Sequence, residues 1–256
     1  MIEDVLQPLA SERFMQDARY REGHLRVINA LPYRRVLGVH IPDMKKAASE
    51  LFKQGGSAEI IRRFEQQPSA SLAYEETVVW GFLINLQKAD LEEHFEMVAR
   101  YVPTMDNWAV CDTFCCNAKW MQKADKERLW RFLQPYFDSG HEFEVRFAVI
   151  ASMCYLLEDE WLDRVFGRVN ALDFGRIKSE YKSVKGKPKT VQEGSVQGAA
   201  PYYVRMGVAW LLATALAKFP DRTRCYARHS NLPADVIKMY VRKARESFRT
   251  RTTDAL

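Results

Sequence analysis

An indole and a carboxylate lie four positions apart near the middle of the chain. Trp108 and Asp112 fall within residues 106–120, where Asp106 or Asn107 can cap a helix. Residues four apart lie on one face of a helix, so this indole and this carboxylate are expected to point the same way. Such a pair suits a substrate that becomes positively charged, because a carboxylate and an aromatic face both attract cations. A tryptophan packed in a core beside a solvated acid is the alternative.

Cysteine and histidine spacing indicates neither a metal site nor a disulfide framework. The five cysteines lack a C-x-x-C motif, their number is odd, and three of them fall within six residues of one predicted helix. Reduced thiols are therefore expected. The five histidines show no H-E-x-x-H spacing. We expect neither a metal nor a cofactor.

The net charge of +5 is divided unevenly along the chain. From residue 176 to the end there are 17 Lys and Arg against six Asp and Glu, a net charge of +11, whereas residues 1–175 carry −6. A basic block of this strength indicates a polyanionic partner. Nucleic acid is favoured over an acidic membrane surface because no apolar anchor accompanies the charge. A merely solvated basic face remains the alternative.

The composition is that of an ordinary globular protein. With 256 residues, 47% hydrophobic and 28% charged, the chain can form one elongated helical domain or two small ones. Residues 1–30 lack the continuous apolar core of a signal peptide. The longest apolar run, residues 206–217, is too short to span a bilayer. We expect a cytoplasmic protein.

Apolar residues recur at helical spacing along most of the sequence, and alternating runs typical of strands are almost absent. The expected fold class is therefore all-α, with antiparallel helix pairs stacked into a solenoid that has one concave face. The helices are predicted at residues 4–29 (one or two helices), 42–52, 58–64, 72–86, 90–101, 107–120, 126–137, 143–157 and 160–169, from Pro201 onward, and at 233–249.

We expect a single domain over residues 1–250, interrupted by a basic insertion loop at about 173–200. That loop carries several lysines and glycines without periodic apolar residues, and it lacks the spacing of a phosphate-binding P-loop. Its lysines could still bind a backbone of phosphates. In the last helix the spacing places Phe248 on the buried stripe, with Arg242 and Lys243 outside. Residues 251–256 are expected to fray.

Over residues 30–250 the chain resembles the AlkD-type DNA alkylation repair glycosylases. The matching motifs are Asn-Trp-Ala-Val-Cys-Asp with Trp108 and Asp112, Phe-Glu-Val-Arg-Phe-Ala-Val-Ile with Arg146, and Pro-Tyr-Tyr-Val-Arg-Met-Gly-Val-Ala-Trp-Leu-Leu with Trp210. The early Leu-Gly-Val-His-Ile-Pro turn around His40 also resembles the first turn of that family. The resemblance implies HEAT-like helix pairs that cradle duplex DNA in a basic concave groove.

The resemblance also implies a reaction and roles for these residues. Asp112 would be the catalytic carboxylate, Trp108 and Trp210 the aromatic walls beside the sugar and backbone of the lesion, and Arg146 a phosphate contact. The implied reaction is excision of N3- and N7-alkylated purines. No activated lysine nucleophile is evident, so a monofunctional glycosylase that leaves an abasic site is expected. Further DNA contacts are expected at His40, Tyr203, Arg205, Arg242 and Lys243.

The expected partner is double-stranded DNA containing alkylated purines. The protein is expected to be a monomer, to have no membrane partner, and to associate with the nucleoid through DNA binding. The family is thought to leave the lesion stacked, which removes the need for a base-reading pocket. One alternative is a non-catalytic DNA-binding paralogue that recognises damaged or branched DNA. A helical scaffold for an acidic protein partner is a third possibility.

Overall fold

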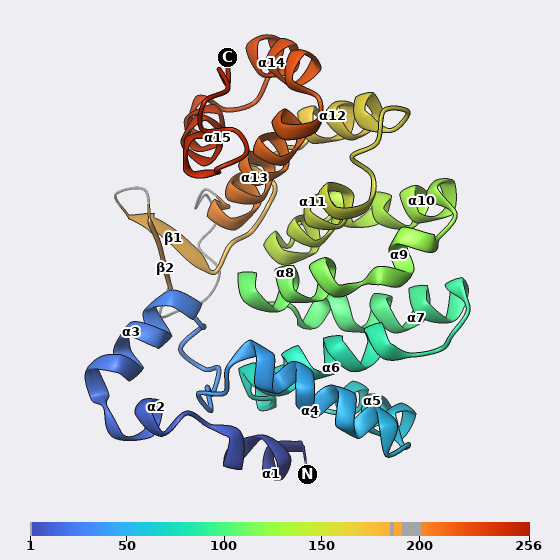
Figure 1. Ribbon diagram of the computed structural model, residues 1–256, viewed down its shortest axis with the longest axis vertical. Coiled ribbons are helices and arrows are strands. Elements are labelled where there is room, and N and C mark those ends of the chain that lie inside the picture. Colours follow the sequence, from blue (N-terminus) through green and yellow to red (C-terminus); the bar gives the residue numbers. More distant parts are fainter. Residues whose placement is uncertain (1, 185–186, 191–200) are drawn as a thin grey trace. The chain divides into compact units, whose positions relative to one another are not determined.

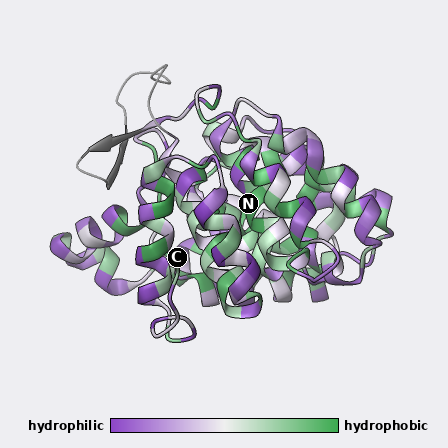
Figure 2. Cartoon of the chain, turned by 90° about the horizontal axis from the view of Figure 1, so that it is seen from above, coloured by the Kyte–Doolittle hydropathy of each residue, from purple (hydrophilic) through white to green (hydrophobic). Residues whose placement is uncertain are grey.

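The structure is a computed structural model that describes residues 2–184, 187–190 and 201–256 (Figure 1). The chain forms two compact units, unit 1 from residues up to Ala124 and unit 2 mainly from Asp125 onward. Within the described residues no helix is both long and apolar enough to cross a membrane. Most helices carry both apolar and polar residues, as expected for elements that bury only one face (Figure 2).

Unit 1 is a stack of helices in which each main helix packs on the next but one. α4 packs on α6 and α6 on α8, so α6 lies between two neighbours and is apolar nearly all round. Its helices are α1 (Ile2–Leu6), α2 (Glu12–Gln16), α3 (Ala18–Ile28), α4 (Ile41–Lys53), α5 (Ser57–Glu65), α6 (Tyr74–Leu86), α7 (Leu91–Tyr101), α8 (Trp108–Asn117) and α9 (Lys119–Lys123). Short 3₁₀ turns occur at Gln7–Leu9, Ser69–Ser71 and Val102–Thr104.

Unit 2 repeats this packing. α11 packs on α13 and α13 on α15, and the central helix α13 is again apolar on most of its surface. The elements are α10 (Lys126–Phe137), α11 (Glu142–Tyr155), α12 (Leu162–Asn170), β1 (Tyr181–Val184), β2 (Lys187–Thr190), α13 (Tyr202–Lys218), α14 (Pro220–His229) and α15 (Ala234–Glu246). The all-α class with repeated helix pairs is thus confirmed.

Several elements differ from the prediction. The helix predicted at 107–120 is divided into α8 and α9. The segment predicted as a basic loop at 173–200 contains the two-stranded sheet of β1 and β2, and residues 185–186 and 191–200 of that segment lie outside the described residues. Helix α14 was not predicted, because its sequence is mostly polar and shows no clear apolar stripe. It begins at Pro220, where a proline is well tolerated.

The prediction for the end of the chain was wrong. α15 ends at Glu246, and the chain then turns instead of continuing as a helix to residue 249. The residues expected to fray pack back onto α15, where Ala255 is buried and its carbonyl accepts a hydrogen bond of 2.8 Å from the Tyr240 hydroxyl. Phe248, expected in the core, is 78% exposed.

Candidate functional site

Trp108 and Asp112 lie one turn apart on α8, as predicted. Asn107 is the capping residue, since its side-chain oxygen accepts a hydrogen bond of 2.8 Å from the backbone N–H of Ala109. The indole N–H of Trp108 donates to the backbone carbonyl of Val27 over 3.2 Å, which fixes the ring against the end of α3. Trp108 is half-buried and Asp112 is 9% exposed. Unit 1 therefore presents a fixed indole and a largely dehydrated carboxylate together.

Buried polar contacts hold the start of α8 in place. The guanidinium of Arg34 donates two hydrogen bonds, of 2.8 and 2.6 Å, to one carboxylate oxygen of Asp106, and a third of 2.9 Å to the carbonyl of Leu72. The side-chain amide of Asn107 donates to the carbonyl of Ile28 over 2.7 Å. Burial raises the pKa of the Asp106 carboxyl, while the charge of Arg34 acts in the opposite direction. The position of Trp108 thus depends on a charged pair that water hardly reaches.

The turn before α4 is fastened by a second buried carboxylate. Glu75 on α6 accepts hydrogen bonds from the backbone N–H groups of Leu37, Gly38 and Val39, at 2.9, 2.8 and 3.3 Å. Burial raises the pKa of Glu75, and these backbone donors lower it. Gly38 has φ +89°, and a Cβ added there would lie 2.2 Å from the Phe14 ring. Only glycine fits this turn.

His40 follows that turn and precedes α4. Its ring is half-buried, with Nε2 3.4 Å from the Tyr20 hydroxyl oxygen and the ring edge-to-face with His24 at 5.7 Å. Burial lowers the pKa of His24, and the neighbouring His40 adds to this effect. The structure therefore places His40 in an aromatic cluster of unit 1, where it packs against other rings.

In unit 2 the structure places Arg146 in the interior. This side chain on α11 is only 3% exposed, and its guanidinium donates a hydrogen bond to the backbone carbonyl of Tyr203. It also lies 5.9 Å from the centre of the Tyr203 ring, which is itself buried. Both residues, predicted to contact DNA, therefore join α11 to the start of α13 in the interior.

Glu142, which the sequence analysis did not single out, completes this buried junction. Its carboxylate accepts a hydrogen bond of 2.6 Å from the backbone N–H of Tyr203 and another from the Ser179 hydroxyl. Burial raises the pKa of Glu142 to about 7, although these donors and the charge of Arg146 lower it. No local sequence signal could reveal this role, because Tyr203 lies 61 positions further along the chain.

The other predicted basic contacts of unit 2 are ion-paired. Arg205 is half-buried, bonds to the Asp235 carboxylate, and lies over the Phe174 ring. On α15, Arg242 and Lys243 both approach Glu246, with nitrogen to oxygen distances of 3.7 and 3.0 Å. These two pairs are exposed or half-exposed, so the basic groups can exchange Glu246 for another anion at low cost.

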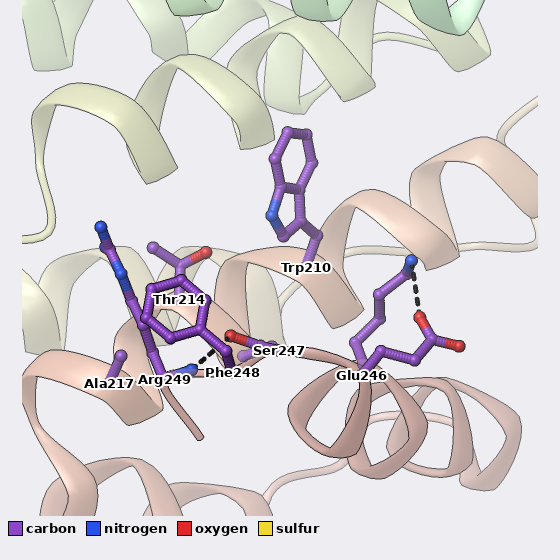
Figure 3. A pocket seen from close by; sticks show the side chains of 9 residues that line it. Trp210, Thr214, Ala217, Glu246, Ser247, Phe248 and Arg249 are labelled. Carbon is purple, nitrogen blue, oxygen red and sulfur yellow. Dashed lines mark hydrogen bonds and ion pairs between the residues drawn. The ribbon is translucent and has the colours of Figure 1, made fainter. Parts of the chain in front are cut away.

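Trp210 lies on the wall of a pocket of about 370 Å³ within unit 2 (Figure 3). The pocket is bounded by α13 and by the turn after α15, which contributes Phe248 and Arg249. Neither was predicted as a site residue, because the helical period continues beyond Glu246 and places Phe248 on the buried stripe. Among the predicted DNA contacts, Lys243 is the one that shares this pocket with Trp210.

In the described part of the chain no cluster of His, Cys, Asp and Glu is arranged to hold a metal ion. The structure shows no disulfide among the five cysteines, Cys111, Cys115, Cys116, Cys154 and Cys225. The predicted site residues are thus divided between the units. Trp108, Asp112 and His40 belong to unit 1, and Arg146, Tyr203, Arg205, Trp210, Arg242 and Lys243 to unit 2.

Comparison with known proteins gives one finding. The sequence profile of a family described as DNA alkylation repair enzyme matches residues 7–172, which is more than half of the chain. Trp108, Asp112 and Arg146 fall within the matched segment, whereas Trp210 follows it. No curated protein and no solved structure gives a significant match.

Proposed function

Because the chain belongs to the family of DNA alkylation repair enzymes, we propose that it is a monofunctional DNA glycosylase for N3- and N7-alkylated purines in duplex DNA. Repair of alkylation damage and DNA as partner follow from the family. The bond that is cleaved and the adducts that are accepted are our proposal. The observation that carries it is the indole and carboxylate on one face of α8, inside the matched segment.

The chemistry needs an anionic group beside the sugar. A purine alkylated at N3 or N7 is cationic, and it leaves as a neutral base when it takes the electron pair of the glycosidic bond. Positive charge then develops on the sugar, and a carboxylate lowers the energy of that state. We assign this role to Asp112, which also orients the water that attacks the anomeric carbon and accepts its proton. At 9% exposure Asp112 is surrounded mainly by protein, where a charge acts more strongly than in water.

The two tryptophans supply aromatic faces in this proposal. Indole faces stabilise a nearby cation by about 0.5–2 kcal/mol, depending on exposure. Trp108 is suited to this role because its N–H is already bonded to Val27, so the ring needs no reordering when substrate binds. In unit 2, Trp210 supplies another aromatic face, on the wall of a pocket of that unit. With charge on the sugar as the feature recognised, the lesion can stay stacked, and no pocket for an extruded base is required.

DNA binding requires basic groups that can reach phosphates. We propose Arg242, Lys243 and His40 as such contacts, and we assign Arg146 and Tyr203 to positioning α13, since both are buried. Arg205 can contact DNA only if it leaves Asp235. The protein is proposed to act as a monomer.

The test is release of free N3-methyladenine and N7-methylguanine from a methylated duplex by purified protein. A monofunctional glycosylase releases both bases and leaves strands that break only after alkaline treatment. Tight, salt-dependent binding without release of base would instead support a non-catalytic DNA-binding protein that recognises damaged or branched DNA. Binding that is indifferent to competitor DNA would favour a protein scaffold.

A further inference from the structure

An ordered turn after α15 holds an aromatic ring in water. Phe248 is 78% exposed. The backbone on both sides of the ring is fixed, because the Ser247 carbonyl accepts hydrogen bonds from the N–H groups of Thr250 and Arg251 at 3.1 and 2.8 Å. Thr250 is buried, and its hydroxyl donates to the Ala244 carbonyl over 2.7 Å. The exposure of the Phe248 ring is therefore built into the turn and does not arise from fraying.

The ring lies beside a guanidinium and an indole. Figure 3 shows Trp210, Phe248 and Arg249 around the pocket of about 370 Å³, with the indole and the guanidinium extending to the same side of the opening. The guanidinium carbon of Arg249 is 5.7 Å from the centre of the Phe248 ring. Lys243 in the same pocket is paired with Glu246, whereas Arg249 forms no ion pair with any residue that the structure describes. The pocket thus offers an unneutralised cation beside the Phe248 ring, and the Trp210 indole also lines it.

These groups match the chemistry of a single nucleotide. A nucleobase stacks on an aromatic ring or a guanidinium plane, and its phosphate accepts hydrogen bonds from arginine. The pocket is at the small end of the range for ligand sites, which is suitable for one nucleotide and too small for a helical peptide. A paired base inside a duplex has no free face to offer Phe248. The ligand is therefore a base that has left the stack, which costs least for a base that has lost its partner.

We infer that this pocket binds one unpaired nucleotide of a DNA strand, with its base stacked on Phe248 and its phosphate on Arg249. The inference rests on the proposed function, which makes DNA the ligand of this surface. It assigns to unit 2 a preference for locally unpaired DNA, such as a bulge, a mismatch or a single-stranded end. This preference is separate from the cleavage assigned to Asp112.

The experiment measures binding of three unmodified DNA probes of equal length by fluorescence anisotropy. The probes are a fully paired duplex, the same duplex with one unpaired thymidine, and single-stranded oligothymidylate. Wild type is expected to bind the bulged duplex more tightly than the paired one. Phe248→Leu, which keeps an apolar side chain without a ring, is expected to lower affinity for the bulged duplex about tenfold, while affinity for the paired duplex is unchanged. Phe248→Tyr is expected to retain the preference.

Two further variants locate the effect. Arg249→Gln is expected to weaken binding of the bulged duplex and to reduce the slope of log K against log salt by about one, as for loss of one phosphate contact. Tyr33→Leu removes another exposed ring, 50% exposed and in unit 1, and is expected to leave the preference intact. Thermal unfolding of each variant checks that its fold is kept.

The inference is overturned if wild type shows no preference, or if Phe248→Leu binds the bulged duplex as wild type does. The inference is also overturned if Phe248→Leu loses affinity equally for all three DNA probes. Tight binding of an acidic peptide that displaces DNA from this pocket would overturn it as well. None of these results depends on release of base from methylated DNA. Preference for unpaired DNA without release of base would support this inference and contradict the proposed function. Release of base without the preference would support the proposed function and contradict this inference.

Discussion

The guanidinium of Arg146 on α11 donates a hydrogen bond to the backbone carbonyl of Tyr203 at the start of α13. One turn earlier on α11, the Glu142 carboxylate accepts a hydrogen bond from the N–H of the same Tyr203. The two charged groups therefore bind both polar groups of one peptide residue in the interior of unit 2. This junction sets the start of α13, the helix that carries Trp210.

Replacing Arg146 by Ala is expected to destabilise the protein by about 2–4 kcal/mol, because the buried Tyr203 carbonyl loses its arginine donor and the positive charge that favours ionised Glu142 is removed. The measurement is urea unfolding, with Arg176→Ala as the control because Arg176 is an exposed arginine of the same unit. The salt dependence of DNA binding should be unchanged. A reduced salt slope at full stability would show instead that Arg146 contacts a phosphate.

Glu142 should make stability depend on pH. Its pKa of about 7 in the folded protein lies above the ordinary value of 4.5, so the folded state holds the proton more tightly than the unfolded state. This group therefore favours folding most at low pH, and its contribution decreases as pH rises from about 4.5 to about 7. The stability of wild type relative to Glu142→Gln should fall by up to about 3 kcal/mol across that window. Parallel stability curves for the two proteins would contradict this assignment.

The buried pair of Arg34 and Asp106 should be far more important than the exposed pair next to it. Arg34→Met removes the cation that pairs with the buried Asp106 carboxylate, which is expected to cost about 3–5 kcal/mol of stability. Arg35→Met breaks a pair with Glu3 in which the arginine side chain is 53% exposed, and should cost less than about 1 kcal/mol. Chemical unfolding of both variants provides the comparison. Adding Asp106→Asn to Arg34→Met should recover part of the loss, and equal losses for the two arginines would refute the argument.

Trp108 should affect the rate of excision more than the binding of DNA. Trp108→Phe removes the hydrogen bond to Val27 and reduces the aromatic face, so single-turnover release of methylated base should slow about tenfold. Trp120→Phe is the matched control, because Trp120 is a half-buried tryptophan of the same unit that stacks on His94. If both variants slow release equally, the effect of Trp108 is one of packing.

Local signals in the sequence predicted most of the helices and one part of the candidate site. Asn107 as a cap and the four-residue spacing are sufficient to place Trp108 and Asp112 on one face, and both were predicted. The error at Phe248 arose because the apolar period continues past the residue where α15 ends. A period shows which face would be buried, but it does not show where the helix stops.

The reason why the burial of Arg146 could not be predicted is different. Its partner Tyr203 lies 57 positions away, and the intervening strands β1 and β2 were predicted as a loop. A motif gives the type of a residue but not the direction of its side chain. Glu142 also bonds to the distant Tyr203, so its role was not predicted either. A glutamate on a helix is usually solvated, and nothing in the local sequence indicated otherwise.

The most direct test of the central claim is single-turnover release of N7-methylguanine and N3-methyladenine from methylated duplex DNA by wild type and Asp112→Asn, with Glu96→Gln on α7 as an exposed control. We predict that Asp112→Asn slows release by at least about a hundredfold, since it removes the charge that stabilises the transition state. Its affinity for DNA and the rate of Glu96→Gln should match those of wild type. Release at the wild-type rate by Asp112→Asn, or no release by any of the three proteins, would contradict the assignment of Asp112 as the catalytic carboxylate.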